Sequence, residues 1–575
     1  MVQEKMYINK SNEIYDAIVI GSGISGGWAA KELCERGLKT LMIERGRVVE
    51  HRKDYPGENK APWQLKHRSK VNNLLIEQQY KVQHQCYAFT DATKHFFGND
   101  RDLPYVVKAG TEFSWIRANQ LGGKSILWHR QSYRWGEYDF NANKQDGHGN
   151  DWPIRTKDIA SWYSHVEKHA GISGANDNLE NLPNSEFLPA FEMTTPEQVI
   201  QKKLAQYYPD RPMIMGRTAH LTKPSELHIS HGRVQCQARN ECQAGCSFGA
   251  YFSTQSSTLP AAAITGNLHI APNSVVHSLI YDPQNNRITG VRVIDNDDLT
   301  EREYFSKIVF VCASTIGTTQ ILMNSISKKF PNGIANSSGV LGHYLMDHNY
   351  NAVTTGDIEG FEHEYYSGRR PTGIMIPNFY YKPNSKRNFL RGYALQGGAY
   401  REGWSEIQHQ DGLGSVYKDK LKHPGKWKFV LKAQGEMLPR FENKMGLHPK
   451  LKDKWGIPQI EFDCQFSENE KNMMLDAAQE AKNMMLKVGL SNVSSQVMHG
   501  PPGLAIHELG TARMGKDPKT SVLNAYNQSH DIPNLFVTDG ASFCSSAVQN
   551  PSLTFMALTA RAVNYAVQEF KQKRL

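Results

Sequence analysis

The first residues of the chain follow a strand–turn–helix–strand order that restricts the fold more than any other part of the sequence. Residues 15–20 (YDAIVI) form a short apolar run that ends at a glycine, and residues 24–36 have helical composition. A second apolar run follows at residues 38–44. This order predicts a βαβ unit, in which a helix joins two parallel strands. We therefore expect a doubly wound α/β domain that begins at the N-terminus.

The predicted turn carries the spacing G-x-G-x-x-G. In this motif the first glycine permits a tight turn, the second lets the backbone approach a pyrophosphate, and the third lets the helix pack on the strand. Glu44 ends the second strand, where a carboxylate can accept hydrogen bonds from ribose hydroxyls. The motif does not by itself separate FAD from NAD, but its N-terminal position and the following Arg45 favour FAD. Its residues are Gly21, Gly23, Ile24, Ser25 and Gly26.

Composition places the chain among ordinary globular proteins. It has 575 residues, of which 39% are hydrophobic and 21% are charged. No apolar run approaches the roughly 18 residues that a membrane span needs, and the start has no apolar signal segment, so a cytoplasmic protein is expected. The net charge is +9, but the basic residues are scattered. We therefore expect no nucleic-acid partner.

The pattern changes along the chain predict two intertwined domains. Residues 251–322 return to an α/β pattern, whereas residues 350–465 contain alternating strands typical of an antiparallel sheet, followed by a helix at 468–487. We expect a nucleotide-binding domain built from residues 1–55, 111–175, 226–345 (with a cysteine-rich loop at 236–246) and 498–575. The substrate domain would comprise 176–225 and 346–497, and residues 56–110 would form an excursion, a lid or a dimer-contact arm.

Two hydrogen-bonding side chains stand out near the other end of the chain. His507 lies in HELGTARMG and Asn550 in QNPSLTFMA, within a segment otherwise rich in glycine, small and apolar residues. An imidazole with a pKa near neutrality can accept a proton at physiological pH. A nucleotide site at one end and a proton acceptor at the other predict a single redox site assembled from both termini.

Four separated motifs together resemble the glucose–methanol–choline (GMC) oxidoreductases, which are FAD enzymes that oxidise alcohols. The motifs are GSGISGG at 21–27, RANQLGGKSILW at 117–128, VFVCASTIGTTQIL at 309–322, and the HELGT and NPSLT pair. Within the family the chain looks most similar to bacterial glucoside 3-dehydrogenases and gluconate-type sugar dehydrogenases. The resemblance implies an α/β fold (α+β overall), with a doubly wound Rossmann-like FAD domain and an antiparallel-sheet substrate domain.

By this resemblance, FAD would contact residues from several separated segments. Some relatives attach FAD covalently through a histidine immediately before the tryptophan of the second motif, and Leu127 occupies that position here, so a noncovalent flavin is expected. Asp539 and Gly540 would form the turn beside the ribityl chain, and the backbone of Val276 would meet adenine. The remaining residues implied in cofactor binding are Arg117, Gly122, Gly123, Ser125, Trp128, Ala313, Asn550 and Thr554.

Oxidation of an alcohol by a flavin removes a hydride from carbon and a proton from oxygen. The resemblance implies that His507 is the base that accepts the proton, and that Asn550 hydrogen-bonds the same hydroxyl and orients it. The histidines His231, His343 and His348 are expected to be structural, with the last two fixing a loop.

Three of the cysteines lie close together in the sequence. Cys236, Cys242 and Cys246 have the spacing C-x5-C-x3-C, and the intervening glycines indicate a loop. By the resemblance, such a loop can hold a 3Fe–4S cluster, because three thiolates can ligate it. The spacing departs from the relatives and their adjacent cysteine pair is missing, so three buried free thiols are the alternative. A zinc site would need a fourth ligand, for which His231 is a poor candidate.

The resemblance implies oxidation of a secondary hydroxyl of a sugar or glycoside, with C3 of a glucoside as the expected position. The electron acceptor would be a quinone, cytochrome c or a dye rather than oxygen. A small partner subunit is also implied, which could carry the folded enzyme to the periplasm. Three alternatives stay open: a pyranose-type oxidase that uses oxygen, a lyase of the same fold with a redox-silent flavin, and a noncatalytic electron-transfer flavoprotein.

Overall fold

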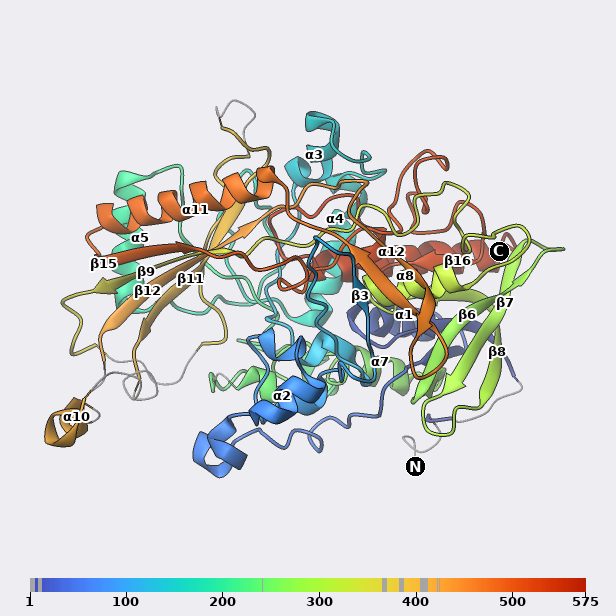
Figure 1. Ribbon diagram of the computed structural model, residues 1–575, viewed down its shortest axis with the longest axis horizontal. Helices are drawn as coiled ribbons and strands as arrows, with labels where there is room; N and C mark the ends of the chain where they lie inside the picture. The colour runs from blue at the N-terminus through green and yellow to red at the C-terminus, as the bar shows by residue number, and fades with distance from the viewer. Residues whose placement is uncertain are drawn as a thin grey trace.

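The computed structural model describes residues 6–8, 13–239, 241–364, 370–381, 387–403, 412–420, 422 and 425–575. Two sheets dominate the molecule, and in Figure 1 strands β9, β11, β12 and β15 lie at the left and β6, β7 and β8 at the right. None of the helices in these ranges is both long and apolar enough to span a membrane.

The larger sheet contains five parallel strands, in the order β5, β2, β1, β8 and β16, with antiparallel β7 and β6 continuing it beside β8. Strands β1 and β2 are almost wholly buried, as expected for parallel strands covered on both faces. The predicted βαβ unit and doubly wound domain are therefore confirmed. The strand bounds are β1 (Ile14–Ile20), β2 (Thr40–Ile43), β5 (Leu268–Ala271), β6 (Ser274–Asp282), β7 (Arg287–Asp295), β8 (Glu301–Val311) and β16 (Leu535–Val537).

Helices cover this sheet and connect its strands. Helix α1 packs against both the sheet and α12, and α12 in turn contacts α4. All three lie in the central and right-hand part of Figure 1. The helices of this part are α1 (Ile24–Glu35), α3 (Glu137–Asp146), α4 (Thr156–Ala170), α6 (Glu226–Ser230), α7 (Thr258–Ile264), α8 (Thr315–Asn324) and α12 (Ser552–Lys571), with short 3₁₀ turns at η5 (Gly123–Ile126), η6 (Cys242–Ala244) and η7 (Gly540–Ser542).

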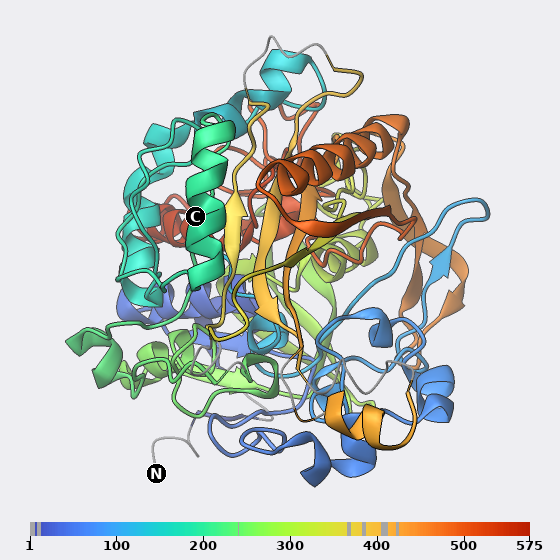
Figure 2. The same cartoon turned by 90° about the vertical axis from the view of Figure 1, so that its left-hand side faces the viewer.

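The second sheet is wholly antiparallel, in the order β15, β9, β12, β11, β10 and β4. Helices α5 and α11 bury one of its faces with leucine, isoleucine and methionine side chains, and Figure 2 shows the two helices beside the strands of this sheet. This confirms the predicted antiparallel sheet. The bounds are β4 (Ile214–Met215), β9 (Ala352–Ile358), β10 (Ile374–Ile376), β11 (Tyr393–Arg401), β12 (Trp427–Gly435), β15 (Ser491–Val497), α5 (Thr195–Tyr207), α10 (Gly414–Lys420) and α11 (Glu468–Lys487).

One predicted strand of residues 350–465 lies elsewhere. Strand β14 (Pro458–Asp463) pairs with β13 (Lys444–Lys452) and with β3 (Val106–Val107) in a separate small sheet. The expectation that the whole segment forms one sheet is therefore wrong at β13 and β14. The β14 partner β3 comes from the distant N-terminal excursion, a pairing that local alternation does not reveal.

The excursion packs beside the junction between the two sheets. Its Phe96 and Phe97 form a small apolar cluster with Tyr55, Ile126 and Leu127. Besides β3 it contains little regular structure: η1 (Pro62–Gln64), η2 (Lys66–Ser69), α2 (Asn73–Gln79), η3 (Gln83–Gln85) and η4 (Lys94–Phe96).

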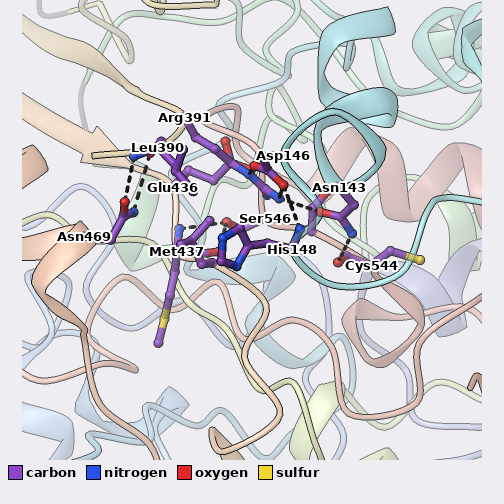
Figure 3. Close-up of polar contacts among 12 residues, drawn as sticks. Asn143, Asp146, His148, Leu390, Arg391, Glu436, Met437, Asn469, Cys544 and Ser546 are labelled. Atoms are coloured by element: carbon purple, nitrogen blue, oxygen red, sulfur yellow. Dashed lines mark hydrogen bonds and ion pairs between the residues drawn. The ribbon is translucent and has the colours of Figure 1, made fainter. Parts of the chain in front are cut away.

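A buried ionic network joins the two parts of the molecule (Figure 3). The Arg391 guanidinium donates to Glu436 Oε1 at 2.6 Å, to Asp146 Oδ2 at 2.7 Å and to Asn143 Oδ1 at 2.7 Å. Asn143 Nδ2 also donates to the carbonyl of Cys544 at 2.8 Å. The side chains of Arg391 and Glu436 are only 1% and 2% exposed. The network thus connects helix α3, the second sheet and the C-terminal segment.

Candidate active site

A cavity of about 740 Å³ lies at the junction of the two sheets. It begins at the carboxyl ends of β1, β2, β8 and β16, the edge where doubly wound folds bind ligands. It ends on strands of the second sheet. The predicted site residues that line it are Gly21, Gly23, Ile24, Ser25, Glu44, Arg45, Arg117, Gly123, Ser125, Trp128, Val276, Ala313, His507, Asp539, Gly540 and Asn550.

The glycines of the first turn have different steric surroundings. Gly21 has a φ of +92°, and a Cβ there would lie 2.5 Å from the Cys312 carbonyl oxygen. A Cβ at Gly26 would lie 1.9 Å from the Gly21 carbonyl oxygen, so this glycine permits helix packing and does not line the cavity. Gly23 faces open space within 4 Å. The helix N-terminus therefore reaches the cavity without a side-chain barrier, as an anion site needs.

Glu44 holds this turn together from the end of β2. Its Oε2 accepts hydrogen bonds from Ser22 N at 3.1 Å and Ser22 Oγ at 2.5 Å, and its Oε1 accepts from Gly46 N at 2.9 Å. Burial raises the pKa of Glu44. Ser22 Oγ also accepts from Gly122 N at 2.8 Å and so links the two glycine turns. The G-x-G-x-x-G pattern did not single out Ser22, because this serine occupies one of its variable positions.

Two further predicted cofactor residues lie behind the cavity wall rather than on it. Gly122 has a φ of +90°, and a Cβ there would collide with the side chain of Gln255. The Thr554 hydroxyl lies 2.8 Å from the hydroxyl of Tyr163 in a buried contact. Neither of these two residues lines the cavity.

His507 and Asn550 lie together, although different C-terminal segments carry them. Asn550 Nδ2 is 3.4 Å from His507 Nε2, and Asn550 Oδ1 accepts a hydrogen bond from Gln396 Nε2 at 3.1 Å. Gln396 also donates to Gln434 Oε1 at 2.8 Å. The second sheet therefore fixes the orientation of the Asn550 amide.

His348 determines which nitrogen of His507 is free. Its Nε2 lies 2.9 Å from the Ala547 carbonyl oxygen, which can only accept, so Nε2 carries the proton. Burial lowers the pKa of His348 to about 4, so the ring is neutral and its Nδ1 is an acceptor. His507 Nδ1, at 3.0 Å from that nitrogen, must donate. The lone pair of His507 is therefore on Nε2.

From the sequence His348 was expected to be only structural, and no role was predicted for the adjacent Asp347. Asp347 accepts backbone hydrogen bonds from Gly503 at 2.6 Å, Ala505 at 3.1 Å and His507 at 3.0 Å. Burial raises the pKa of Asp347 to about 7. His343, in contrast, stacks on Phe441 away from the cavity. The motif MDH could have indicated a polar site, but its partners are distant in sequence.

Both histidines of the pair are held neutral. Burial lowers the pKa of His507 well below its ordinary value, and the nearby positive charge of Lys124 adds to this effect. Lys124 Nζ forms an ion pair with Glu508 Oε2 at 2.8 Å. At neutral pH, His507 Nε2 is therefore an unprotonated acceptor at the end of the cavity.

The cysteine loop does not bring its thiols into a ligating group. Cys242 Sγ lies 3.5 Å from His220 Nε2, and Cys246 Sγ lies 3.8 Å from the Arg239 guanidinium. Burial raises the pKa of Cys236 to about 11 and also raises that of Cys242. In the part of the chain that the structure describes, which omits residue 240, no set of three His, Cys, Asp or Glu side chains is placed to hold a metal ion. This arrangement gives no support to the expected 3Fe–4S cluster.

Comparisons with known proteins identify the family of this chain. Two family models described as GMC oxidoreductase match residues 15–350 and 439–559. A 2-methyl-1,2-propanediol dehydrogenase of Mycolicibacterium austroafricanum is 28% identical, with 96% of this chain and 95% of that protein covered. The fructose dehydrogenase large subunit of Gluconobacter japonicus is 24% identical, covering 97% of this chain and 98% of that subunit.

The fold is also shared with a solved flavoenzyme. A structure of Aspergillus oryzae RIB40 formate oxidase, determined to study modification of its FAD, has a TM-score of 0.60 at 14% identity, with 98% of this chain and 100% of that chain covered. The glycine turn falls within the first family match, and His507 and Asn550 fall within the second. The chain therefore belongs to the GMC oxidoreductases, a family of flavoproteins that bind FAD.

Proposed function

We propose that this protein is an FAD-dependent dehydrogenase that oxidises a secondary hydroxyl of a sugar or glycoside, with C3 of a glucoside as the preferred position. The observation that carries the proposal is the free Nε2 of His507 beside the Asn550 amide. Both line the cavity that begins at the glycine turn. The proton acceptor His507 and the glycine turn that would bind the nucleotide therefore line the same cavity.

The residues of the cavity fit a bound FAD. The α1 N-terminus behind Gly23 suits the pyrophosphate, and Glu44 retains lone pairs for ribose hydroxyls. Glu508 Oε1 is buried and has no hydrogen-bond partner among the described residues, although its side chain lines the cavity. Such an atom is expected to accept a hydrogen bond from a bound molecule, because buried polar groups rarely stay unpaired.

Bound FAD would supply the acceptor for the substrate hydride. The chain's own contribution is the proton transfer: the substrate hydroxyl donates to His507 Nε2, and Asn550 Nδ2 is placed to orient the same oxygen. Gln396 keeps the Asn550 amide in this orientation through its contact with Oδ1. His348 keeps the Nδ1 of His507 protonated, so that Nε2 stays available.

Replacing His348 with leucine is expected to slow flavin reduction by a saturating sugar about 10- to 100-fold. The change leaves the buried Nδ1–H of His507 without an acceptor, which costs roughly 1–3 kcal/mol, and it removes the contact that fixes the tautomer. His348→Gln retains a side-chain oxygen that can accept and should recover part of the rate. Rapid-mixing absorbance measures both variants, with His343→Leu as the control. Equal rates for the leucine and glutamine variants would contradict this role.

The flavin is expected to be noncovalent, because Leu127 occupies the position from which some relatives attach FAD. Precipitation of the purified holoprotein with acid should therefore release all of the yellow colour into the supernatant. Absorbance spectra of pellet and supernatant measure the distribution, and a covalent flavoprotein treated in parallel is the control. Colour retained in the pellet would refute the assignment.

The proposed electron acceptor is a quinone, cytochrome c or dye, which the electrons reach through a partner subunit. The same subunit could carry the folded enzyme to the periplasm. The test is a panel of sugars and glycosides assayed with an artificial dye and with an oxygen electrode, followed by NMR of the product. A 3-keto product with dye reduction supports the proposal. Stoichiometric peroxide indicates the oxidase alternative, and cleavage without electron transfer indicates the lyase.

The 3Fe–4S cluster stays a prediction, which iron analysis of anaerobically purified protein can test.

A further inference from the structure

Lys432 lies on the face of the second sheet that lines the cavity. On β12, Phe429, Leu431 and Ala433 pack into the core beneath α11, so the alternate residues face the other way. Both Val430 and Lys432 line the cavity, where Lys432 is exposed.

Lys432 is one side chain away from the catalytic pair. It is the direct cross-strand partner of Gln396 on β11, and such neighbours have Cβ atoms about 4.5–5.5 Å apart. Gln396 Nε2 in turn donates to Asn550 Oδ1 at 3.1 Å. A substrate held at His507 and Asn550 therefore has the Lys432 ammonium within the reach of its other substituents.

A second cation, Arg130, lines the same cavity and an adjoining one of about 140 Å³. Its Nη2 donates to the carbonyl oxygens of Ile126 and Cys242, each at 2.8 Å, and its guanidinium carbon lies 3.9 Å from the Tyr251 ring centroid. Its buried Nε has no hydrogen-bond partner within the described ranges. These contacts fix the guanidinium without neutralising its charge.

The positive charges of Arg130 and Lys432 both affect the side chain of His129. His129 lines both cavities, and burial lowers its pKa to about 4, with further lowering by the charges of Arg130 and Lys432. The ring is therefore neutral and adds no charge of its own. Arg130 and Lys432 together make this end of the cavity positive.

The carboxylates of the cavity wall are engaged elsewhere. Glu44 accepts from Ser22 and Gly46, Glu508 pairs with Lys124, and Asp539 accepts from Thr318 and Ala541. Lys428, on the same strand as Lys432, has its own partner in Glu402 at 2.8 Å. Over the described residues, no ion pair or hydrogen bond is found for the Lys432 side chain.

We propose that the substrate is an acidic sugar, whose carboxylate is held by Lys432 and Arg130 while the hydroxyl to be oxidised contacts His507 and Asn550. Ammonium and guanidinium groups bind carboxylates and phosphates through charge-assisted hydrogen bonds. The lysine supplies a mobile charge and the arginine a fixed one. This inference rests on the proposed function and narrows its substrate class to uronides and sugar acids.

The test compares methyl glucuronide, methyl glucoside and glucose 6-phosphate as reductants of the flavin in the anaerobic holoprotein. The inference predicts that the ratio of reduction rate to dissociation constant is about tenfold or more higher for the glucuronide than for the glucoside, and that added salt narrows the difference. A preference for the phosphate over both would reassign the anionic group to a phosphate ester and overturn the sugar-acid assignment. An equal or better rate with the neutral glucoside would overturn the inference entirely.

Lys432→Gln provides the second arm, with Lys428→Gln as a matched control on the same strand. Lys432→Gln should lower the ratio of reduction rate to dissociation constant about tenfold for the glucuronide and change it by less than about twofold for the glucoside. The control Lys428→Gln should leave both ratios unchanged. If Lys432→Gln has the parent ratio for the glucuronide, this lysine does not bind the carboxylate. If neither sugar reduces the flavin, the proposed function itself fails. This outcome is distinct from failure of the acidic-sugar inference, in which the glucoside still reduces the flavin.

Discussion

Replacing His507 with alanine is expected to slow reduction of the bound flavin by a saturating sugar about 10²- to 10⁴-fold, the usual contribution of general-base catalysis. The variant loses the unprotonated Nε2 that faces Asn550, while the substrate must still release a proton as its hydride leaves. The glycine turn and Glu44 are untouched, so the flavin content should match that of the parent protein. Anaerobic rapid mixing, followed at the absorbance band of the oxidised flavin, measures the step without the electron acceptor.

The control for this experiment is His343→Ala, because His343 stacks on Phe441 and does not line the cavity. That variant should reduce its flavin at the parent rate. If His507→Ala stays within about threefold of the parent rate, a difference of well under 1 kcal/mol in the barrier, then another group is the base.

Arg391→Ala should destabilise the protein by about 3–5 kcal/mol, the usual cost of removing one partner from a buried ion pair. The change would leave the Glu436 carboxylate, only 2% exposed, without its cation, and would remove the contacts with Asp146 and Asn143. Since Asn143 also binds the carbonyl of Cys544, the C-terminal segment should loosen as well. Denaturant and thermal unfolding of the holoprotein measure the loss.

The matched control is Lys471→Ala. Its ion pair with Glu468 is exposed on helix α11, with side chains 58% and 79% accessible, and exposed pairs contribute roughly 0–1 kcal/mol. Equal stabilities for the two variants would show that the network in Figure 3 is not a significant link between the two parts of the molecule.

Local features of the sequence predicted the parts of the fold that depend on local chemistry. The glycine spacing at 21–26 was informative because a Cβ at Gly21 or Gly26 would collide with the backbone. Helix α11 was predicted with its observed bounds at 468–487, since its apolar period is regular and Ser467 caps its start with Glu470. The strand β14 was misplaced, because strand pairing depends on residues far away in the chain.

In the candidate site, too, local motifs could be predicted from the sequence, whereas contacts between residues far apart in the chain could not. The motifs around His507 and Asn550 could be recognised, but the tautomer of His507 depends on a chain of contacts through His348 to the Ala547 carbonyl, which no local pattern encodes. Likewise, alternation on β12 indicates two faces, and only the packing of α11 shows that Lys432 is on the cavity side. For the cysteine loop, spacing suggested a cluster that the arrangement of side chains does not support.

The most direct test of the central claim is anaerobic mixing of the holoprotein with a panel of sugars, glycosides and sugar acids, while the absorbance of the oxidised flavin is recorded. The proposed function predicts complete loss of that absorbance with at least one member of the panel and one equivalent of ketone product per flavin reduced, by the two-electron stoichiometry of the reaction. A flavin that stays bound and oxidised in the presence of every member of the panel would contradict the assignment of this cavity as a site of sugar oxidation.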